Sequence, residues 1–488
     1  MKKLAIIGAG KMAVSMAVAA KKLGVETHCF GTRVGSSAMS IVDYFYDVDV
    51  FDAESIIGIC RKAQIDGVAA ATDLGLVTAA RAAAALGLVG NAPEDAERYT
   101  DKYQARLLTQ SVPAMKQPRF FPVAQPEDLA LADLACPVIL KPRTGSGKMG
   151  VCVLASPSDA EACFQYAEQD CGKGVKLLAE ERLPGDHVFS AETLSWQGEH
   201  YLIQVTLEKT SGPPHFVEIS LEEPAANTPE MREKIRQALF PALTAIGVRN
   251  GPCHTEFKLI DNEVWLIEYN VRPAGWPIAD RMIRLSTGYS YLRGVIEIAL
   301  GRFCPQSAQR LENRFAGACD IPDSNRALSA VFRRCARYAW CDQRYVAPPS
   351  DGAETTHTSC ELSYVICRAD EPTNLRSLMA TEPERQKRDG QTVMILGDPG
   401  TERGIVMRLR EEGKTLISCG AVDAGWADRA YGARPEDAED GLRFLALVEN
   451  PDEILTFDPV WETACRSLRA ALGLDGMSGE KDSGEESI

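Results

Sequence analysis

The stretch that most constrains the fold is residues 253–272, CHTEFKLIDNEVWLIEYNVR, which predicts two apolar strands joined at an Asp-Asn turn. Glu256 precedes that turn by about the distance at which Glu268 follows it, so the two carboxylates face each other across the hairpin. Asn270 lies two residues after Glu268 and therefore projects from the same face. The alternative is a pair of solvated glutamates on an outer face.

Two carboxylates in a mostly apolar hairpin repel each other, and a shared divalent cation removes that repulsion. Oxygen-only ligands suit Mg²⁺ (or Mn²⁺) that bridges phosphate oxygens. The sequence therefore predicts a metal site at Glu256, Glu268 and Asn270. Arg272 continues the same face and can bind an anionic reacting group through two parallel hydrogen bonds.

Two lysines and a glycine loop predict a site for phosphate groups. Lys102 starts the helical segment TDKYQARL, and Lys141 ends the apolar strand PVILKP. A flexible glycine loop follows, and it can fold its amides over phosphates while the lysines neutralise their charge. Taken singly, each lysine is equally consistent with plain solvent exposure. The loop residues expected at the phosphates are Gly145, Ser146, Gly147, Lys148 and Gly150.

The segment LLAEERLPGDH is an apolar strand that runs into Glu180, Glu181 and Leu183. A strand edge of this kind can bind adenine through its backbone, and a neighbouring acid can hold the ribose hydroxyls. The alternative is an ordinary charged strand end.

The amino-terminal IIGAGKMA places Gly8, Gly10 and Ala13 in a GxGxxA turn between a strand and a helix. A nicotinamide site also needs an acid at the end of the second strand, and the chain has Arg33 there instead. Arg33 could serve the phosphate of NADP. The alternative is a tight strand–helix turn that binds no dinucleotide.

The chain divides into regions of different character. Residues 1–95 alternate strands and helices, as in a doubly wound α/β unit that continues through 89–90. Residues 96–310 carry paired strands with flanking helices, which indicates an α+β layer. Residues 311–474 alternate strands with charged helical runs, and the acidic tail at 475–488 is too polar to order itself.

Composition excludes several classes of function. A formal charge of −15 and a pI of about 5.1 argue against nucleic-acid binding, which needs a clustered basic face. Charges interrupt the most apolar stretches, so we expect no membrane span. The 15 cysteines are scattered without a CxxC pair, which favours free thiols in a reducing, cytoplasmic environment.

Taken in order, Lys102, Lys141 with its loop, the Glu180-Glu181 edge and the 256–272 set resemble the ATP-grasp superfamily. The resemblance implies an ATP-grasp fold over 96–310, with a central lid at about 113–190. It implies a Rossmann-like preceding domain at 1–95 that binds no NAD. The extra carboxy-terminal α+β region at 311–474 departs from the family pattern, because it is longer than the small closing subdomain usual in the related ligases.

Within that superfamily the chain is most similar to L-amino-acid ligases of the bacilysin type. His215–Ala225 resembles their His-Phe-x-Glu stretch, and 272–276 resembles their Arg-x-x-Gly-Trp stretch. The resemblance implies that Arg272 and His215 act on the reacting carboxylate, and that Glu218 and Trp276 shape the substrate pocket. His187 stands near the ribose position, where many members have a glutamate.

The implied reaction is ATP-dependent amide formation between a small carboxylate and an amine through an acyl phosphate, and a homodimer is compatible with it. Alternatives are bicarbonate or formate activation, an NADP oxidoreductase, and a non-catalytic nucleotide-binding protein.

Overall fold

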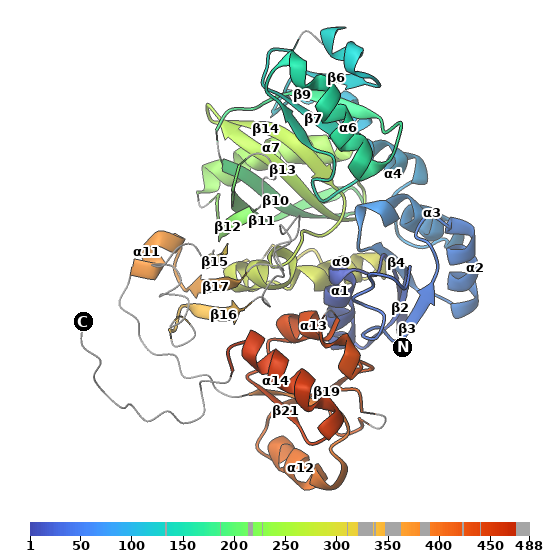
Figure 1. Ribbon diagram of the computed structural model, residues 1–488, viewed down its shortest axis with the longest axis vertical. Helices are drawn as coiled ribbons and strands as arrows, with labels where there is room; N and C mark the ends of the chain where they lie inside the picture. Colours follow the sequence, from blue (N-terminus) through green and yellow to red (C-terminus); the bar gives the residue numbers. More distant parts are fainter. Residues whose placement is uncertain are drawn as a thin grey trace.

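The computed structural model describes residues 1–131, 134–185, 187–212, 218–226, 228–309, 311–320, 335, 338–346, 363–380, 391–421, 424–439 and 441–474. The predicted acidic tail at 475–488 lies outside them. The strands in the described ranges form one nine-stranded sheet and three four-stranded sheets. Figure 1 shows the amino-terminal unit in blue, beside the large sheet, and the carboxy-terminal unit in red below it.

The amino-terminal unit is a parallel sheet in the order β3-β2-β1-β4. The predicted strand before the amino-terminal glycine turn is β1, one of the two central strands of this sheet. Gly8 follows that strand at φ 103°, and a Cβ there would lie 2.5 Å from Cγ2 of Thr72, so close packing alone explains this glycine. The strand expected at 89–90 does not form. The elements are β1 (Lys2–Ile7), α1 (Lys11–Lys22), β2 (Val25–Gly31), β3 (Tyr44–Asp47), α2 (Ala53–Ala63), β4 (Gly67–Ala70), α3 (Leu76–Leu86) and α4 (Pro93–Tyr99).

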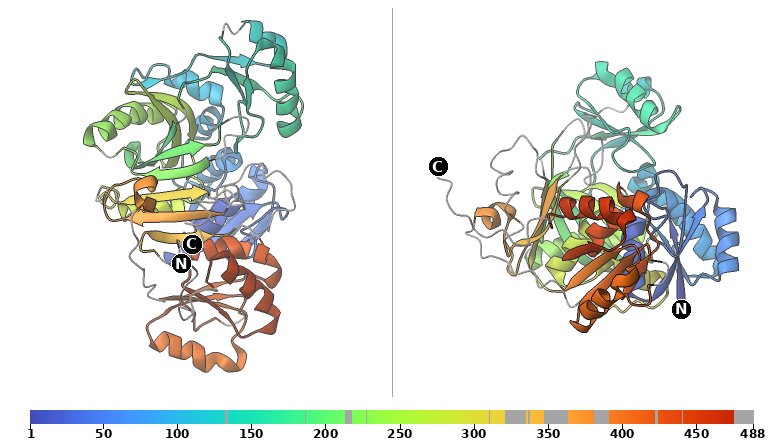
Figure 2. Two further views of the ribbon diagram at one scale, coloured as in Figure 1. Left: turned by 60° about the vertical axis from the view of Figure 1, so that its left-hand side comes forward. Right: turned by 60° about the horizontal axis from the view of Figure 1, so that its bottom comes forward.

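A small antiparallel sheet, here called the lid sheet, has the order β6-β9-β7-β8. In both views of Figure 2 it projects from the rest of the molecule. Cys152 and Cys163 form a disulfide, with Cα atoms 5.8 Å apart because β8 packs on α6. The expectation that all thiols are free is wrong for this pair. The elements are β6 (Phe120–Val123), β7 (Val138–Pro142), β8 (Cys152–Leu154), α6 (Ala160–Cys171) and β9 (Leu177–Glu181).

The nine-stranded sheet has the order β16-β17-β15-β12-β11-β10-β13-β14-β5. β13 and β14 form the predicted hairpin, and its turn residues Asp261 and Asn262 have φ of 50° and 62°. Thr228 caps the start of helix α7, because its hydroxyl accepts a hydrogen bond from the backbone N–H of Met231. The elements are α5 (Lys102–Thr109), β5 (Met115–Lys116), β10 (His187–Trp196), β11 (Glu199–Thr210), β12 (Glu218–Glu223), α7 (Pro229–Ala245), β13 (Gly251–Ile260), β14 (Glu263–Asn270), α8 (Ile283–Thr287) and α9 (Tyr291–Ala299).

The region after residue 311 is not the single α+β unit that the sequence indicated. Its first strands extend the nine-stranded sheet, because β15 pairs with β12 and so covers an edge that would otherwise be unpaired. Only the part from residue 391 onward forms a separate sheet. The elements that extend the large sheet are β15 (Phe315–Asp320), β16 (Cys341–Tyr345) and β17 (Tyr364–Ala369), followed by α11 (Leu375–Ala380).

The carboxy-terminal unit is a second parallel sheet, in the order β20-β19-β18-β21. Trp461 lies across its carboxyl edge, where a Cβ on Gly397 would come within 2.6 Å of the indole. Parallel sheets bind ligands at this edge, and here the indole packs against it. The elements are β18 (Thr392–Leu396), α12 (Arg403–Glu411), β19 (Thr415–Cys419), β20 (Arg429–Tyr431), α13 (Gly441–Glu449), β21 (Glu453–Thr456) and α14 (Glu462–Ala471).

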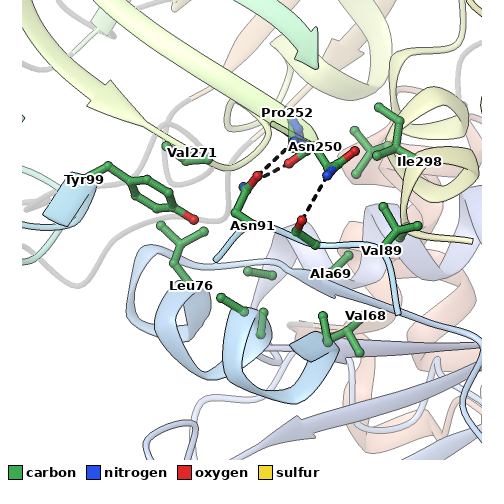
Figure 3. A pocket seen from close by; sticks show the side chains of 18 residues that line it. Val68, Ala69, Leu76, Val89, Asn91, Tyr99, Asn250, Pro252, Val271 and Ile298 are labelled. Atoms are coloured by element: carbon green, nitrogen blue, oxygen red, sulfur yellow. Dashed lines mark hydrogen bonds between the residues drawn. The ribbon is translucent and has the colours of Figure 1, made fainter. Parts of the chain in front are cut away.

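Two asparagines fasten the amino-terminal unit to the start of β13. The side-chain oxygen of Asn91 accepts the backbone N–H groups of Arg249 and Asn250, each across 2.8 Å. Asn250 in turn donates to the carbonyl of Gly90 across 2.9 Å, beside a small cavity of about 70 Å³ (Figure 3). These bonds fix the first unit relative to the strand that carries Glu256.

Candidate functional site

A cleft of about 470 Å³ lies between the lid sheet and the nine-stranded sheet. It is walled by β7, β9 and the loop at 148–151 on one side, and by β11, β13 and β14 on the other. Seven of the predicted site residues line it, namely Lys141, Lys148, Glu180, Glu181, Leu183, Glu256 and Glu268. Segments more than 100 residues apart in sequence therefore meet in one place.

The two carboxylates of the hairpin lie opposite each other, as predicted. Glu256 of β13 and Glu268 of β14 are paired in register, and a bulge follows Glu256. Asn270 is buried and is paired with His254, two residues along the same ladder from the acid pair. The β13–β14 hairpin thus presents two acids to the cleft and an amide next to them.

Each carboxylate of the pair has a cation beside it. Lys102 Nζ lies 3.1 Å from Glu268 Oε1 and also donates to the carbonyl of Gly145 across 3.0 Å. His254 Nε2 lies 3.5 Å from Glu256 Oε1. Burial alone would raise the pKa of Glu256, but His254, Lys148 and Arg272 together outweigh it and lower that pKa to about 2. Glu256 is therefore ionised at neutral pH.

His254 was not predicted, although its place two residues before Glu256 puts both side chains on one face. Its Nδ1 lies 2.6 Å from Oε1 of Glu192, whose side chain is fully buried. Burial would lower the pKa of His254, but the carboxylates of Glu192, Glu256 and Glu208 together outweigh this and raise it well above its usual value. The three side chains form a row, acid–imidazolium–acid, from the buried Glu192 to the partly exposed Glu256 in the cleft.

Lys141 lies on β7 of the lid sheet, where its side chain is buried and forms an ion pair with Glu180. Its Nζ lies 2.8 Å from Glu180 Oε2 and donates to the carbonyl of Ile267 across 3.2 Å. Arg106, which was not predicted, donates from Nε to the other oxygen of Glu180 and from Nη2 to Ile267 across 2.8 Å. Its sequence signal is its place one helical turn after Lys102.

Glu180 is paired with two cations, and its strand is not an edge strand. One oxygen of Glu180 accepts a hydrogen bond from Arg106 and the other from Lys141, and a role of this carboxylate toward a ribose stays a prediction. Strand β9 is also an inner strand, paired with β6 and with β7 as far as Glu181. After β9, the backbone N–H of Arg182 still donates to the carbonyl of Pro137. Leu183 is therefore the first residue after this strand that lines the cleft and whose backbone lies outside the ladder.

The glycine loop takes the backbone conformation that its glycines allow. Gly145, Gly147 and Gly150 have φ of 113°, 70° and 66°. Lys148 also has a positive φ, 62°, and its Nζ lies 2.6 Å from Glu218 Oε1. Burial would lower the pKa of Lys148, but the charges of Glu218 and its neighbours raise it. Lys148 thus connects the loop to β12.

Arg272 lies at the junction with the amino-terminal unit. Its Nε donates to Oδ2 of Asp73 across 2.7 Å, and its Nη1 donates to the carbonyl of Pro273. Burial would lower the pKa of the guanidinium, but Asp73 outweighs it and raises that pKa. Asp73 follows the end of β4, a position where parallel sheets commonly place functional groups, and this signal could have found it.

Two further predicted residues do not line the cleft, and a third is not among the described residues. Trp276 is buried in the core, where its Nε1 donates to the Tyr364 hydroxyl across 2.9 Å and its ring packs edge-on against Phe444. It does not line the cleft, and its place in the substrate pocket stays a prediction. His187 is exposed at the start of β10. His215 lies outside the described residues.

The cleft also contains Glu208 of β11, which sequence reasoning missed. This residue is 5% exposed, and no described residue hydrogen-bonds to its Oε1. Burial, reinforced by the charges of Glu218 and Glu256, raises the pKa of Glu208 to about 8. The alternation of side chains along β11 could have identified Glu208, because it lies two residues after Thr206 and therefore on the same buried face.

Nowhere in the described ranges do three or more His, Cys, Asp or Glu side chains gather so that they could hold a metal ion. Any metal at the acid pair would rely on two carboxylates and one amide. Of the helices that the structure describes, none is both long and apolar enough to cross a membrane.

The chain is similar to known ATP-grasp proteins. The ATP-grasp domain family matches residues 134–280. The alanine–anticapsin ligase of Bacillus subtilis is 28% identical over 248 residues, which are 46% of this chain and 52% of that ligase. The chain therefore spans about half the length of this relative. The crystal structure of an L-amino acid ligase from Bacillus licheniformis has a TM-score of 0.63 at 23% identity and covers 78% of this chain and 95% of its own.

A second solved structure, the ADP complex of an N5-carboxyaminoimidazole ribonucleotide synthetase, has a TM-score of 0.59 at 17% identity, covering 76% of this chain and 93% of its own. At these identities the solved structures show the fold. The chain therefore has an ATP-grasp fold, and its residues 134–280 match the ATP-grasp domain family.

Proposed function

We propose that this chain is an ATP-dependent carboxylate–amine ligase that joins two amino-acid-like substrates and releases ADP and phosphate. The observation that carries the proposal is the facing pair of side chains Glu256 and Glu268, which shares one cleft with the buried amine of Lys141. The similarity to the alanine–anticapsin ligase, over about half of that protein, supports amino-acid-like substrates.

The acid pair fits a divalent metal. Glu256 is ionised, Glu268 faces it in register, and Asn270 adds an amide oxygen, which is the donor set that Mg²⁺ (or Mn²⁺) prefers. When bound, the metal would neutralise charge on phosphate oxygens. Lys102 and Lys141 would neutralise the rest, while residues 145–150 fold over the phosphates.

The chemical steps need positioning more than a covalent residue. A substrate carboxylate oxygen attacks the γ-phosphorus and ADP leaves, giving an acyl phosphate. The amine nitrogen then attacks the acyl carbon, the carbon–oxygen bond to phosphate breaks, and the nitrogen loses a proton. Asp73 and Pro273 occupy Nε and Nη1 of Arg272, so Nη2 is available to hold the carboxylate, since no described residue hydrogen-bonds it. The closed loop would keep water from the acyl phosphate.

The test is phosphate release from MgATP by the purified chain, with L-amino acids supplied singly and in pairs. We expect release only with suitable substrates, and an amide product detected by mass spectrometry. Glu268→Gln should lose turnover and keep its fold, whereas Glu263→Gln, at the exposed end of the same strand, should retain turnover. Full phosphate release by Glu268→Gln, or hydride transfer to NADP in place of ligation, would overturn the proposal.

A further inference from the structure

A second large cavity, of about 600 Å³, shares no lining residue with the cleft. Its walls are α1 of the amino-terminal unit, the segment 278–293, and the carboxy-terminal unit around Glu449. Figure 1 shows α1 beside α13 at this junction. A volume of this size, at a junction between units, is typical of small-molecule sites. We call it the junction cavity.

Most charged side chains of the junction cavity are already paired. Glu449 is buried and accepts from Arg429 across 2.8 and 3.1 Å and from the Tyr431 hydroxyl across 2.6 Å, with Lys22 Nζ 3.0 Å away. Three further groups are paired as follows: Arg281 with Asp342, Arg293 with Glu297, and Asp452 with the backbone N–H of Thr392.

Two charged side chains on one wall form no direct ion pair with a described residue. Arg284 lines the cavity, and the charges of Asp342, Glu449 and Asp280 act on its guanidinium only from a distance. Asp280, four residues earlier on the same helical segment, accepts a hydrogen bond from the hydroxyl of Ser15 across 2.7 Å, while the charges of Lys22, Arg284 and Arg281 act on it from a distance. The wall therefore presents one guanidinium and one carboxylate that influence each other without a direct ion pair.

The balance of charge decides which ligand fits. Five cationic side chains and three carboxylates line the cavity. Two further carboxylates, which do not line it, pair with Arg281 and Arg293, so the charges balance. A simple anion would match Arg284 but would approach Asp280 unfavourably, and a simple cation would do the reverse. A small zwitterion satisfies both groups and leaves the cavity neutral.

We propose that the junction cavity binds a free α-amino acid, with the carboxylate on Arg284 and the ammonium on Asp280. The guanidinium can bind a carboxylate through two parallel hydrogen bonds, and the carboxylate of Asp280 has acceptor positions beyond the one that Ser15 occupies. This site is separate from the cleft and does not depend on the proposed ligase activity.

The test is isothermal titration calorimetry without ATP, on the full chain, with each of the common L-amino acids. We expect at least one to bind, with affinity about 10- to 100-fold lower in Arg284→Gln and in Asp280→Asn, because each loses a charge-assisted contact. Arg293→Gln is the matched control, since that guanidinium lines the same cavity but is held by Glu297.

Two further arms separate this site from the cleft and from simple anion binding. The N-acetyl and amide derivatives of the bound amino acid, each lacking one charge, should bind about as weakly as the variants. Arg272→Gln, altered where the proposed ligase would hold its substrate carboxylate, should retain the binding. The proposal is overturned if no amino acid binds at millimolar concentration, if Arg284→Gln and Asp280→Asn bind like the parent chain, or if inorganic phosphate binds at Arg284 and amino acids do not.

Discussion

Arg272 of the large sheet and Asp73 of the amino-terminal unit are 199 residues apart in sequence, yet Arg272 Nε donates to Asp73 Oδ2 across 2.7 Å. The contact fixes the guanidinium by its Nε edge, while no described residue accepts a hydrogen bond from Nη2. A unit that binds no nucleotide in this proposal therefore still contributes to the site, because it holds the arginine that would bind the substrate carboxylate.

Asp73→Asn tests that contact. The amide keeps the shape of the carboxylate but loses a charge-assisted bond worth about 1.5–3 kcal/mol, so we expect kcat/KM to fall about 10- to 100-fold. Steady-state phosphate release at saturating ATP measures it. Asp47→Asn is the control, since that carboxylate pairs with Arg33 on an exposed part of the same unit. Equal effects of the two substitutions would argue against a special role for Asp73.

Glu180→Gln tests the buried charges under the lid sheet. Lys141 and Arg106 would then share no carboxylate, and buried cations without a partner typically cost about 3–5 kcal/mol of unfolding free energy. We expect a loss of that size in urea unfolding. Glu181→Gln, the next residue, changes an exposed pair with Arg119 and should alter stability by less than about 1 kcal/mol. A Glu180→Gln chain as stable as its parent would contradict the assignment.

The parts of the fold that are encoded locally were predictable from the sequence. The 253–272 hairpin follows from an Asp-Asn turn and strand alternation, and its register confirms the pairing of Glu256 with Glu268. The contacts that complete the site join residues far apart, such as Arg106 to Glu180, and no short pattern specifies which acid meets which base. The same reason explains the error after residue 311, where β15 pairs with β12, about 95 residues earlier.

Glu223 predicts how stability depends on pH. It is fully buried, accepts hydroxyls of Thr206 and Ser286, and burial raises its pKa from 4.5 to about 8. Between those values the folded chain keeps a proton that the unfolded chain has lost, so this group makes stability fall as pH rises from 4.5 to 8.

We therefore expect Glu223→Gln to match the parent near pH 4.5 and to be more stable by about 2–5 kcal/mol at pH 8. Urea unfolding at both pH values measures the difference. Glu222→Gln, at the neighbouring position where Lys209 pairs with the carboxylate, should show no such gain on the alkaline side. A difference between Glu223→Gln and the parent that is independent of pH would refute the titration of Glu223.

The row Glu192–His254–Glu256 yields the last prediction. His254→Gln leaves Glu192 as a fully buried carboxylate without its cation, so we expect a loss of about 3–5 kcal/mol in unfolding free energy. Glu192→Gln/His254→Gln removes both charges and should recover most of that loss, which a double-mutant cycle would record as coupling. His200→Gln is the control: burial lowers the pKa of His200 to about 4, so this neutral ring bonded to Ser195 and Thr244 leaves no charge behind. Additive losses for the two substitutions in the row would show that His254 does not balance Glu192.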